Sequence, residues 1–185
     1  MDENQIIKNC QGGNLKQFGE LYEKYIKKIY DFVYYKTHHK ETAEDLVSSV
    51  FFKALEKIGR FESAKGSFQA WLYQIARNTV IDHYRTKKTD RNIEDIWGLA
   101  GNEDLARDID TREKVGQIEA YLKELKAEQR DIIIMRVWQG LSHREIAEAL
   151  GKSEASVKMI YSRALRQLRQ DMPLALFFIL LSKGL

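Results

Sequence analysis

The sequence contains very little cysteine and proline. A single cysteine, Cys10, cannot form a disulfide within the chain, which favours a reducing cytoplasmic compartment. A single proline, Pro173, leaves nearly all of the chain free of the residue that most strongly interrupts helices. The first residues are acidic and polar, whereas a secretory signal needs a basic segment and then an apolar one. We therefore expect a cytoplasmic, largely helical protein.

Recognisable catalytic motifs are also lacking. The sequence contains no glycine-rich phosphate loop, no nucleophile elbow and no paired catalytic carboxylates. The histidines are dispersed and lack metal-ligand spacing with Cys10; they are His38, His39, His83 and His143. We expect no catalytic residues, no metal site, no cofactor and no enzymatic activity of its own.

Long apolar runs are absent except for the eight residues 174–181 after Pro173. Eight residues are too few for a membrane-spanning helix, which needs about twenty. We expect residues 173–185 to form an apolar C-terminal tail with a short helix that docks on the preceding domain. The alternative is a regulatory surface for a partner or for the chain's own first domain.

The net charge of +3 conceals an uneven distribution along the chain. Residues 1–91 carry a net charge of +4, residues 92–113 carry −5, and residues 114–185 carry +4. Two basic blocks therefore flank an acidic strip. Basic blocks favour a polyanionic partner, although a solvated surface explains them equally well on charge alone.

Apolar residues recur at helical spacing in several segments separated by loops. The spacing predicts helices over 18–33, 43–58 and 68–85, with Thr42 and Asp45 as a capping pair for the second, and helical spacing resumes at Val115. The rhythm fails between residues 86 and 113. The predicted fold is all-α, with two small helical domains, 1–91 and 114–172, joined by a flexible acidic linker, 92–113.

The most specific local pattern lies in residues 140–169. Ser142 and Glu145 are spaced as a capping box, Gly151 suits a left-handed turn, and Ser153 can cap the next helix. The second helix has a polar and basic outer side. This pattern predicts a helix-turn-helix that places its second helix in the DNA major groove. A plain helical hairpin with a solvated basic face is the alternative.

Two longer stretches resemble a known family. Residues 43–61 and 68–88, with the intact motif W-L-x-x-I-A-R-N-x-x-x-D-x-x-R from Trp71 to Arg85, resemble the promoter-melting domain of extracytoplasmic-function (ECF) sigma factors. Residues 122–158 are similar to the second domain of that family. The resemblance implies a sigma region 2 helical bundle followed by a sigma region 4 helix-turn-helix domain.

The resemblance implies that the first domain binds RNA polymerase core and the minus-10 promoter element. The segment that would bind the clamp helices of the large subunit contains Glu44, Asp45, Leu46, Ser48, Phe51 and Lys53. The residues expected at the minus-10 element are Lys65, Ser67, Arg77, Asn78, Asp82, Arg85, Lys87 and Lys88. Asn78 is expected to contact a base, the cationic residues to hold phosphates, and the loop from Phe61 to Phe68 to accept an unstacked base. Trp71 is expected to pack in the core.

The resemblance implies that the second domain binds the minus-35 element and the flap of the other large subunit. The expected DNA-binding residues are Arg144, Glu154, Ser156, Lys158, Met159, Ser162, Arg163 and Arg166. The pair Met159-Ile160 stands where relatives usually have Ser-Arg, which shifts phosphate binding toward Arg163 and Arg166. The acidic linker suits a basic channel of the polymerase.

These expectations describe a dissociable polymerase subunit that recognises promoters and helps to melt them. The implied partners are RNA polymerase core, promoter DNA and an anti-sigma factor, with no membrane insertion. Two alternatives are a helix-turn-helix regulator that acts without core, and an interaction protein that sequesters core. The first alternative leaves residues 43–88 unexplained.

Overall fold

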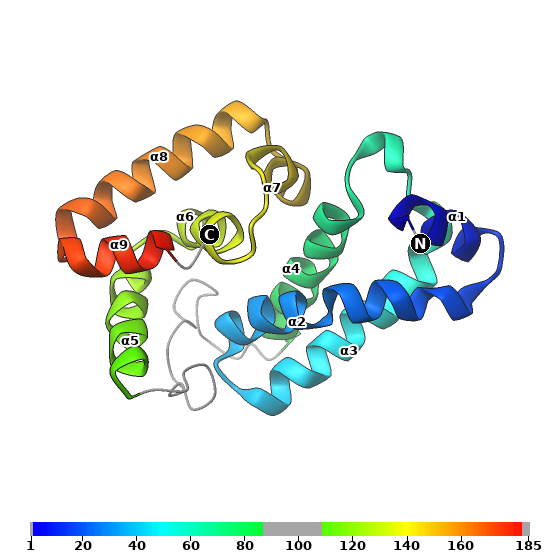
Figure 1. The fold of residues 1–185 in the computed structure, drawn as a ribbon, viewed down its shortest axis with the longest axis horizontal. Coiled ribbons are helices and arrows are strands. Elements are labelled where there is room, and N and C mark those ends of the chain that lie inside the picture. The colour runs from blue at the N-terminus through cyan, green and yellow to red at the C-terminus, as the bar shows by residue number, and fades with distance from the viewer. Residues whose placement is uncertain (1, 87–108, 183–185) are drawn as a thin grey trace. The chain divides into compact units, whose positions relative to one another are not determined.

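The computed structural model describes residues 2–86 and 109–182, and within these ranges all regular structure is helical (Figure 1). The chain divides into two compact units, Met1–Asp90 and Arg91–Leu185, and each is described by itself. The all-α prediction is confirmed for the described residues. Lys87, Lys88 and the linker residues 92–108 lie outside them.

The first unit is built from four α-helices. Their bounds are α1 (Glu3–Gln11), α2 (Phe18–Thr37), α3 (Lys40–Lys57) and α4 (Phe68–Thr86). Short 3₁₀ turns connect them: η1 (Leu15–Gln17), η2 (Ile58–Arg60) and η3 (Ser63–Lys65). The helices α2, α3 and α4 pack against one another, and α1 packs against α2 and η2.

Aromatic side chains fill much of the core of the first unit. Phe32 and Tyr73 are fully buried and meet edge to face with ring centroids 5.2 Å apart. Phe68, the first residue of α4, is 2 % exposed and packs against Phe61 and Trp71. The buried Phe68 therefore holds the start of α4 against the loop before it, and Trp71 has the packing role expected for it.

The capping pair predicted for the second helix is wrong. Helix α3 begins at Lys40, and its N-cap is His39, whose ring nitrogen Nδ1 accepts a hydrogen bond from the backbone N–H of Thr42 at 3.3 Å. His38, immediately before it, has φ = 47° and ends α2 in the left-handed conformation. The two adjacent histidines thus form a tight corner between α2 and α3.

The second unit contains five α-helices within the described residues. Their bounds are α5 (Ile109–Lys123), α6 (Ala127–Ile133), α7 (His143–Leu150), α8 (Glu154–Asp171) and α9 (Leu174–Ser182). A π-helical segment, η5 (Ile134–Trp138), continues α6. Helix α5 begins inside the range predicted as linker, so residues 109–113 belong to the helix.

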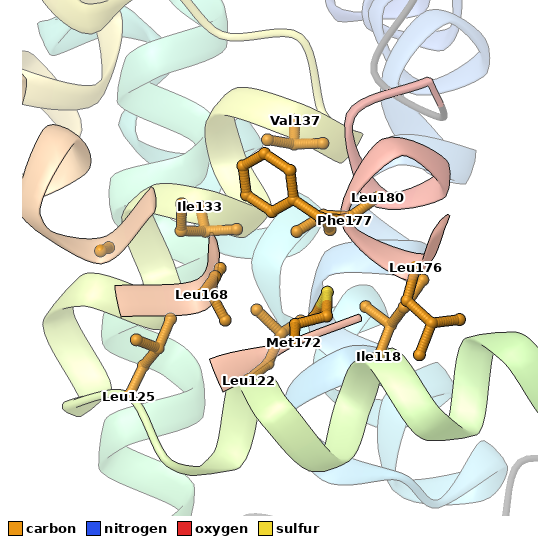
Figure 2. Packing of buried hydrophobic residues seen from close by; sticks show 11 residues of the cluster. Ile118, Leu122, Leu125, Ile133, Val137, Leu168, Met172, Leu176, Phe177 and Leu180 are labelled. Carbon is orange, nitrogen blue, oxygen red and sulfur yellow. The ribbon is translucent and has the colours of Figure 1, made fainter. Parts of the chain in front are cut away.

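The core of the second unit is mainly aliphatic and includes the C-terminal helix. Leu176, Phe177 and Leu180 of α9 are buried in a cluster with residues of α5, α6, η5 and α8 (Figure 2). In Figure 1, α9 (red) lies beside α5 and the end of α8, as their contacts also show. The predicted docking of the tail on this unit is therefore confirmed. None of the helices described crosses the threshold of length and apolarity that a membrane span requires.

Candidate functional site

The helix-turn-helix forms as the sequence predicts. The Ser142 hydroxyl accepts from the backbone N–H of Glu145 at 3.2 Å, and the Glu145 carboxylate accepts from the Ser142 N–H at 2.9 Å. Gly151 ends α7 with φ = 64°, a conformation that glycine adopts without a Cβ penalty. The Ser153 hydroxyl then accepts from the Ser156 N–H at 3.2 Å. Three local caps therefore fix the angle at which α8 leaves the turn.

Helix α8 buries one side and leaves a polar and basic side open. Val157, Ala164 and Leu168 are buried against the rest of the unit. The predicted minus-35 residues on α8 are exposed except for the partly buried Ser156: Glu154, Ser156, Lys158, Met159, Ser162, Arg163 and Arg166. Their common side on a single helix is the arrangement that major-groove reading requires.

The cations of this surface differ in whether they are paired. Arg144 lies 3.2 Å from Glu148, and Lys158 lies 2.6 Å from Glu154. The hydrogen bond from Lys158 lowers the pKa of the Glu154 carboxyl. Arg163 and Arg166 form no ion pair with any residue that the structure describes. Phosphate binding by these two arginines therefore breaks no ion pair among the described residues, unlike binding by Arg144 or Lys158.

His143 is placed at the first position of α7 and packs against α8. Its ring meets Tyr161 edge to face at 5.2 Å, and no described residue hydrogen-bonds its buried Nε2 atom. Burial lowers the pKa of His143, and the nearby Arg136 and Lys158 lower it further, whereas Glu154 acts in the opposite direction. The surroundings of His143 therefore disfavour its charged form.

In the first unit, α4 presents a polar stripe to solvent. Asn78, Asp82 and Arg85 are all exposed, as their spacing predicts. Gln74, one turn before Asn78, is exposed on the same stripe, and the sequence analysis missed it although its i−4 spacing from Asn78 was available. Arg77, in contrast, is partly buried and lies about 100° around α4 from Asn78.

The loop before α4 uses two of its predicted DNA-binding residues for its own structure. The Ser67 hydroxyl accepts from the Ala70 N–H at 3.1 Å and so caps α4. Lys65 is exposed and pairs with Glu62 at 2.7 Å. Ser67 therefore caps α4, because its oxygen satisfies a backbone donor at the helix start, and its contact with DNA stays a prediction.

A cavity of about 270 Å³ lies between α1 and this loop. Gln11 lines it, and the Gln11 side-chain amide donates to the backbone oxygens of Ile58 and Phe61 at 3.1 and 2.7 Å. The lining residues are Asn4, Ile7, Lys8, Gln11 and residues 61–64. The hydrogen bonds from Gln11 of α1 and the ring contacts of Phe68 therefore hold the loop in place.

The residues expected to bind the polymerase clamp divide into exposed and buried sets on α3. Glu44, Asp45 and Ser48 are exposed, whereas Leu46 and Phe51 are 7 % and 5 % exposed. The two buried residues pack in the core and offer little surface to a partner, and their role at the clamp stays a prediction.

Two more residues of α3, Lys53 and Phe52, bear on the predicted clamp-binding surface. The ammonium group of Lys53 donates to the Thr79 hydroxyl at 3.1 Å and so ties α3 to α4. Phe52 is 62 % exposed, next in sequence to the buried Phe51, and the sequence analysis missed it. An exposed phenylalanine beside exposed acidic residues suits a protein contact better than Phe51 does. Among the described residues, no cluster of histidine, cysteine and carboxylate side chains suits a metal ion.

Comparison with known proteins matches both units. The model of sigma-70 region 2 matches residues 21–89, and the model of sigma-70 region 4 matches residues 116–168. These two ranges together cover more than half of the chain. Region 2 thus contains the α4 stripe, and region 4 contains the helix-turn-helix.

Several curated relatives are similar over most of the chain. BldN of Streptomyces coelicolor, an ECF RNA polymerase sigma factor, is 33% identical over 174 residues, which are 91% of this chain and 65% of BldN. YlaC of Bacillus subtilis is 33% identical, covering 83% of this chain and 90% of YlaC. SigX of the same organism, another ECF sigma factor, is 34% identical, covering 85% of this chain and 84% of SigX.

Solved structures share the fold. CnrH, in complex with the cytosolic domain of CnrY, matches with a TM-score of 0.68 and 21% identity over 89% of this chain and 93% of CnrH. RpoE of Bartonella quintana, in complex with the anti-sigma factor NepR, matches with a TM-score of 0.64 and 22% identity over 84% of this chain and 96% of RpoE. Both sigma-70 region models match this chain, SigX and YlaC are similar to it in sequence, and the solved structures share its fold. The chain therefore belongs to the ECF family of RNA polymerase sigma factors.

Proposed function

We propose that the two units divide promoter recognition between them, with α4 engaging the melted minus-10 strand and α8 engaging the minus-35 duplex. Sigma factors bind RNA polymerase core and direct it to promoters for initiation. The observation that carries the division of labour is the difference between the two exposed surfaces. The α4 stripe combines uncharged Gln74 and Asn78 with one acidic residue, Asp82, and one basic residue, Arg85. In contrast, α8 presents Arg163 and Arg166, which form no ion pair with any residue that the structure describes.

At the minus-35 element, α8 lies in the major groove with its first turns near the base edges. Arg163 and Arg166 bind phosphates and supply most of the salt-dependent affinity. Lys158 leaves Glu154 when it reaches DNA, and exposed Met159 offers an apolar contact to a thymine methyl group. Arg144, on the preceding helix, contributes less because Glu148 already neutralises it.

At the minus-10 element, Asn78 is the central base-reading residue. Its amide carries both a donor and an acceptor, it is exposed at the middle of the stripe, and Arg85 lies two turns further along for a phosphate. The cavity between α1 and the loop is the candidate position for an unstacked base. The firm attachment of the loop to Gln11 and Phe68 supports this role, because a base pocket must be formed before the strand arrives.

Binding to core is assigned to the exposed side of α3. Glu44, Asp45, Ser48 and Phe52 lie there, with the acidic residues at the start and the phenylalanine near the end. The chain has no catalytic activity of its own, since the polymerase forms the phosphodiester bonds, and it acts in the cytoplasm with the polymerase. An anti-sigma factor is a further partner, by analogy with RpoE bound to NepR. The acidic linker is assigned to a basic polymerase channel on its charge.

The division of labour is tested by changing Asn78. We expect Asn78→Ala to slow promoter opening about tenfold, in line with the worth of one good base contact, and to leave core binding unchanged. Opening is followed by fluorescence of a 2-aminopurine in the minus-10 strand, and core binding by gel filtration. Asn14→Ala, an exposed asparagine in the turn after α1, is the control and should behave like the unchanged chain. Equal loss of core binding and opening in Asn78→Ala would instead make Asn78 structural.

A further inference from the structure

Helix α1 forms one side of the cavity beside the loop that precedes α4. Asn4, Lys8 and Gln11 follow one another on α1 at spacings of four and three, and all three line the cavity. In Figure 1, α1 (dark blue) lies beside η2, from which the loop departs, as their contacts also show. The region 2 model begins at residue 21, so α1 lies outside the segment that the family comparison matched.

Helix α1 is itself attached firmly to the rest of the first unit. Its inner side chains, Ile6, Ile7 and Cys10, are at most 5 % exposed. The Tyr25 hydroxyl of α2 donates to the Glu3 carboxylate at 2.6 Å. A side chain that reaches the loop from α1 therefore starts from a fixed backbone, which is what the positioning of a loop requires.

Gln11 joins this fixed helix to the start of the loop. Its amide nitrogen Nε2 donates both to the Ile58 oxygen and to the Phe61 oxygen, at 3.1 and 2.7 Å. Both partners are carbonyl oxygens, which only accept hydrogen bonds. The role of Gln11 at the loop therefore needs a donor, and a carboxylate of the same size cannot take it over.

The cavity also contains one cation whose charge no carboxylate answers. Glu62, on the loop side, pairs with Lys65 at 2.7 Å. Lys8, on the α1 side, is exposed and forms no ion pair with any residue over 2–86 and 109–182. Its position in the last turn of α1 suits the helix dipole, which is the alternative role for its charge. A nucleotide that enters the cavity brings a phosphate, which a lysine binds as a point charge.

We propose that α1 completes the minus-10 pocket. Gln11 positions the loop, and Lys8 binds the phosphate of the nucleotide whose base enters the cavity. This proposal rests on the assignment of the minus-10 strand to the first unit. Because Gln11 sets the shape of the loop that selects the base, it acts on discrimination between bases without touching DNA. Lys8 contacts a group that all nucleotides share, so it adds affinity without discrimination.

The role of Gln11 is tested with holoenzyme on promoters selected by run-off transcription and then varied to each base at every minus-10 position. Gln11→Glu keeps the size of the side chain and removes both donors. We expect about tenfold less discrimination at one minus-10 position, the worth of one base contact, and unchanged discrimination at the others. Gln11→Lys keeps a donor and should retain the discrimination. Gln5→Glu makes the same change on α1 outside the cavity lining and should have no effect.

Hydrogen exchange of the free chain gives a measurement on the same variant that needs no DNA. In Gln11→Glu, residues 61–66 should exchange faster, whereas α2, α3 and α4 should exchange at the rates of the unchanged chain. Faster exchange throughout these three helices would make Gln11 a residue that stabilises the whole bundle, which would contradict a positioning role.

The role of Lys8 is tested by the salt dependence of holoenzyme binding to the same promoters. Lys8→Ala should weaken binding by a similar factor on every promoter. The slope of log affinity against log salt should become shallower by roughly 0.7 to 1, because one phosphate contact is lost. Lys16→Ala removes an exposed lysine that does not line the cavity and should leave the slope unchanged.

Either of two results with DNA would also overturn the proposal. Output from Gln11→Glu that is unchanged, or reduced equally for all four bases, would deny Gln11 any part in base selection. An unchanged salt slope in Lys8→Ala would leave Lys8 to the helix dipole. Asn78→Ala separates these failures from a failure of the promoter assignment, because it should slow opening in both cases. Unimpaired opening in Asn78→Ala would overturn the promoter assignment and this proposal with it.

Discussion

The two units are both helical, yet their cores are made from different side chains. Among the described residues, the first unit buries eight aromatic side chains and the second buries one, Phe177. The first core contains edge-to-face ring pairs such as Phe32 with Tyr73, whereas the second consists mainly of leucine, isoleucine, valine and methionine. Aromatic pairs prefer defined geometries, while aliphatic contacts are less directional.

This difference between the cores matches the difference between the surfaces that the two units expose. The first unit holds a loop and a polar stripe in fixed positions, and the rings of Phe61, Phe68 and Trp71 contact one another where that loop begins and ends. The second unit exposes one helix, α8, for binding. Caps at Ser142, Gly151 and Ser153 set the position of this helix, so fewer directional core contacts are needed to hold it.

The largest expected effect comes from removing a ring under the loop. Phe68→Ala should lower the free energy of unfolding of the first unit by about 3–5 kcal/mol, because it leaves a cavity among packed rings. Hydrogen exchange measured by mass spectrometry should show faster exchange in α1 and α4 and unchanged exchange in α7 and α8. Phe52→Ala, at a 62 % exposed position of the same unit, should change stability by less than about 0.5 kcal/mol. Faster exchange in both units after Phe68→Ala would show that the two cores are not separate.

The next effect concerns the unpaired arginines of α8. Arg163→Ala with Arg166→Ala should weaken holoenzyme binding to minus-35 duplex DNA about 10- to 100-fold. The slope of log affinity against log salt should become shallower by about 2, because two phosphate contacts are lost. Filter binding at several salt concentrations measures both quantities.

Arg144→Ala provides the matched control for that change. Because Arg144 pairs with Glu148, its removal should cost less than about threefold in affinity. Arg144→Ala could instead weaken DNA binding as much as the double change does. The ion pair that a cation forms in the free chain would then not predict how much that cation contributes to DNA affinity.

A smaller effect is expected from pH in the second unit. The unfolded chain protonates His143 near the ordinary pKa of about 6.5, while the partly buried imidazole of the folded chain has a lowered pKa. The unfolded state therefore binds more protons below that pH, and the stability of the second unit should fall as pH is lowered from 7.5 to 5.5. Thermal unfolding, monitored by hydrogen exchange in α7 and α8, should show this fall in stability. The variant His143→Gln should show a smaller fall. An equal pH dependence in the variant would contradict the assignment to His143.

Local signals in the sequence were sufficient for the helix-turn-helix of the second unit, but not for the start of α5, which lies inside the predicted linker. The spacing of Ser142 and Glu145, the glycine at 151 and the serine at 153 each predict a hydrogen bond or turn that depends only on residues within four positions. The helix 68–85 was predicted to within one residue of its end for the same reason, since its apolar period is unbroken.

Tertiary contacts decided what the sequence could not. Thr42 and Asp45 have the right spacing for a cap, but the His39 ring takes that position because α2 ends in the left-handed corner at His38. The helical period places Phe51 on the apolar side of α3, and its packing against Tyr22 shows how little of its surface is left exposed. The hydrogen bond from Lys53 to the Thr79 hydroxyl likewise joins α3 to a residue 26 positions further along the chain.

The account's central claim, that two differently built units act together on one promoter, is tested most directly by run-off transcription. Purified core polymerase is given a promoter library with the unchanged chain, with Asn78→Ala, or with Arg163→Ala plus Arg166→Ala. We expect new transcript starts that require the chain, with strongly reduced output from both variants although core binding is retained. No chain-dependent start on any promoter would contradict the account. It would leave a DNA-binding regulator if the chain alone bound duplex DNA tightly, or a core-sequestering protein if it bound only polymerase.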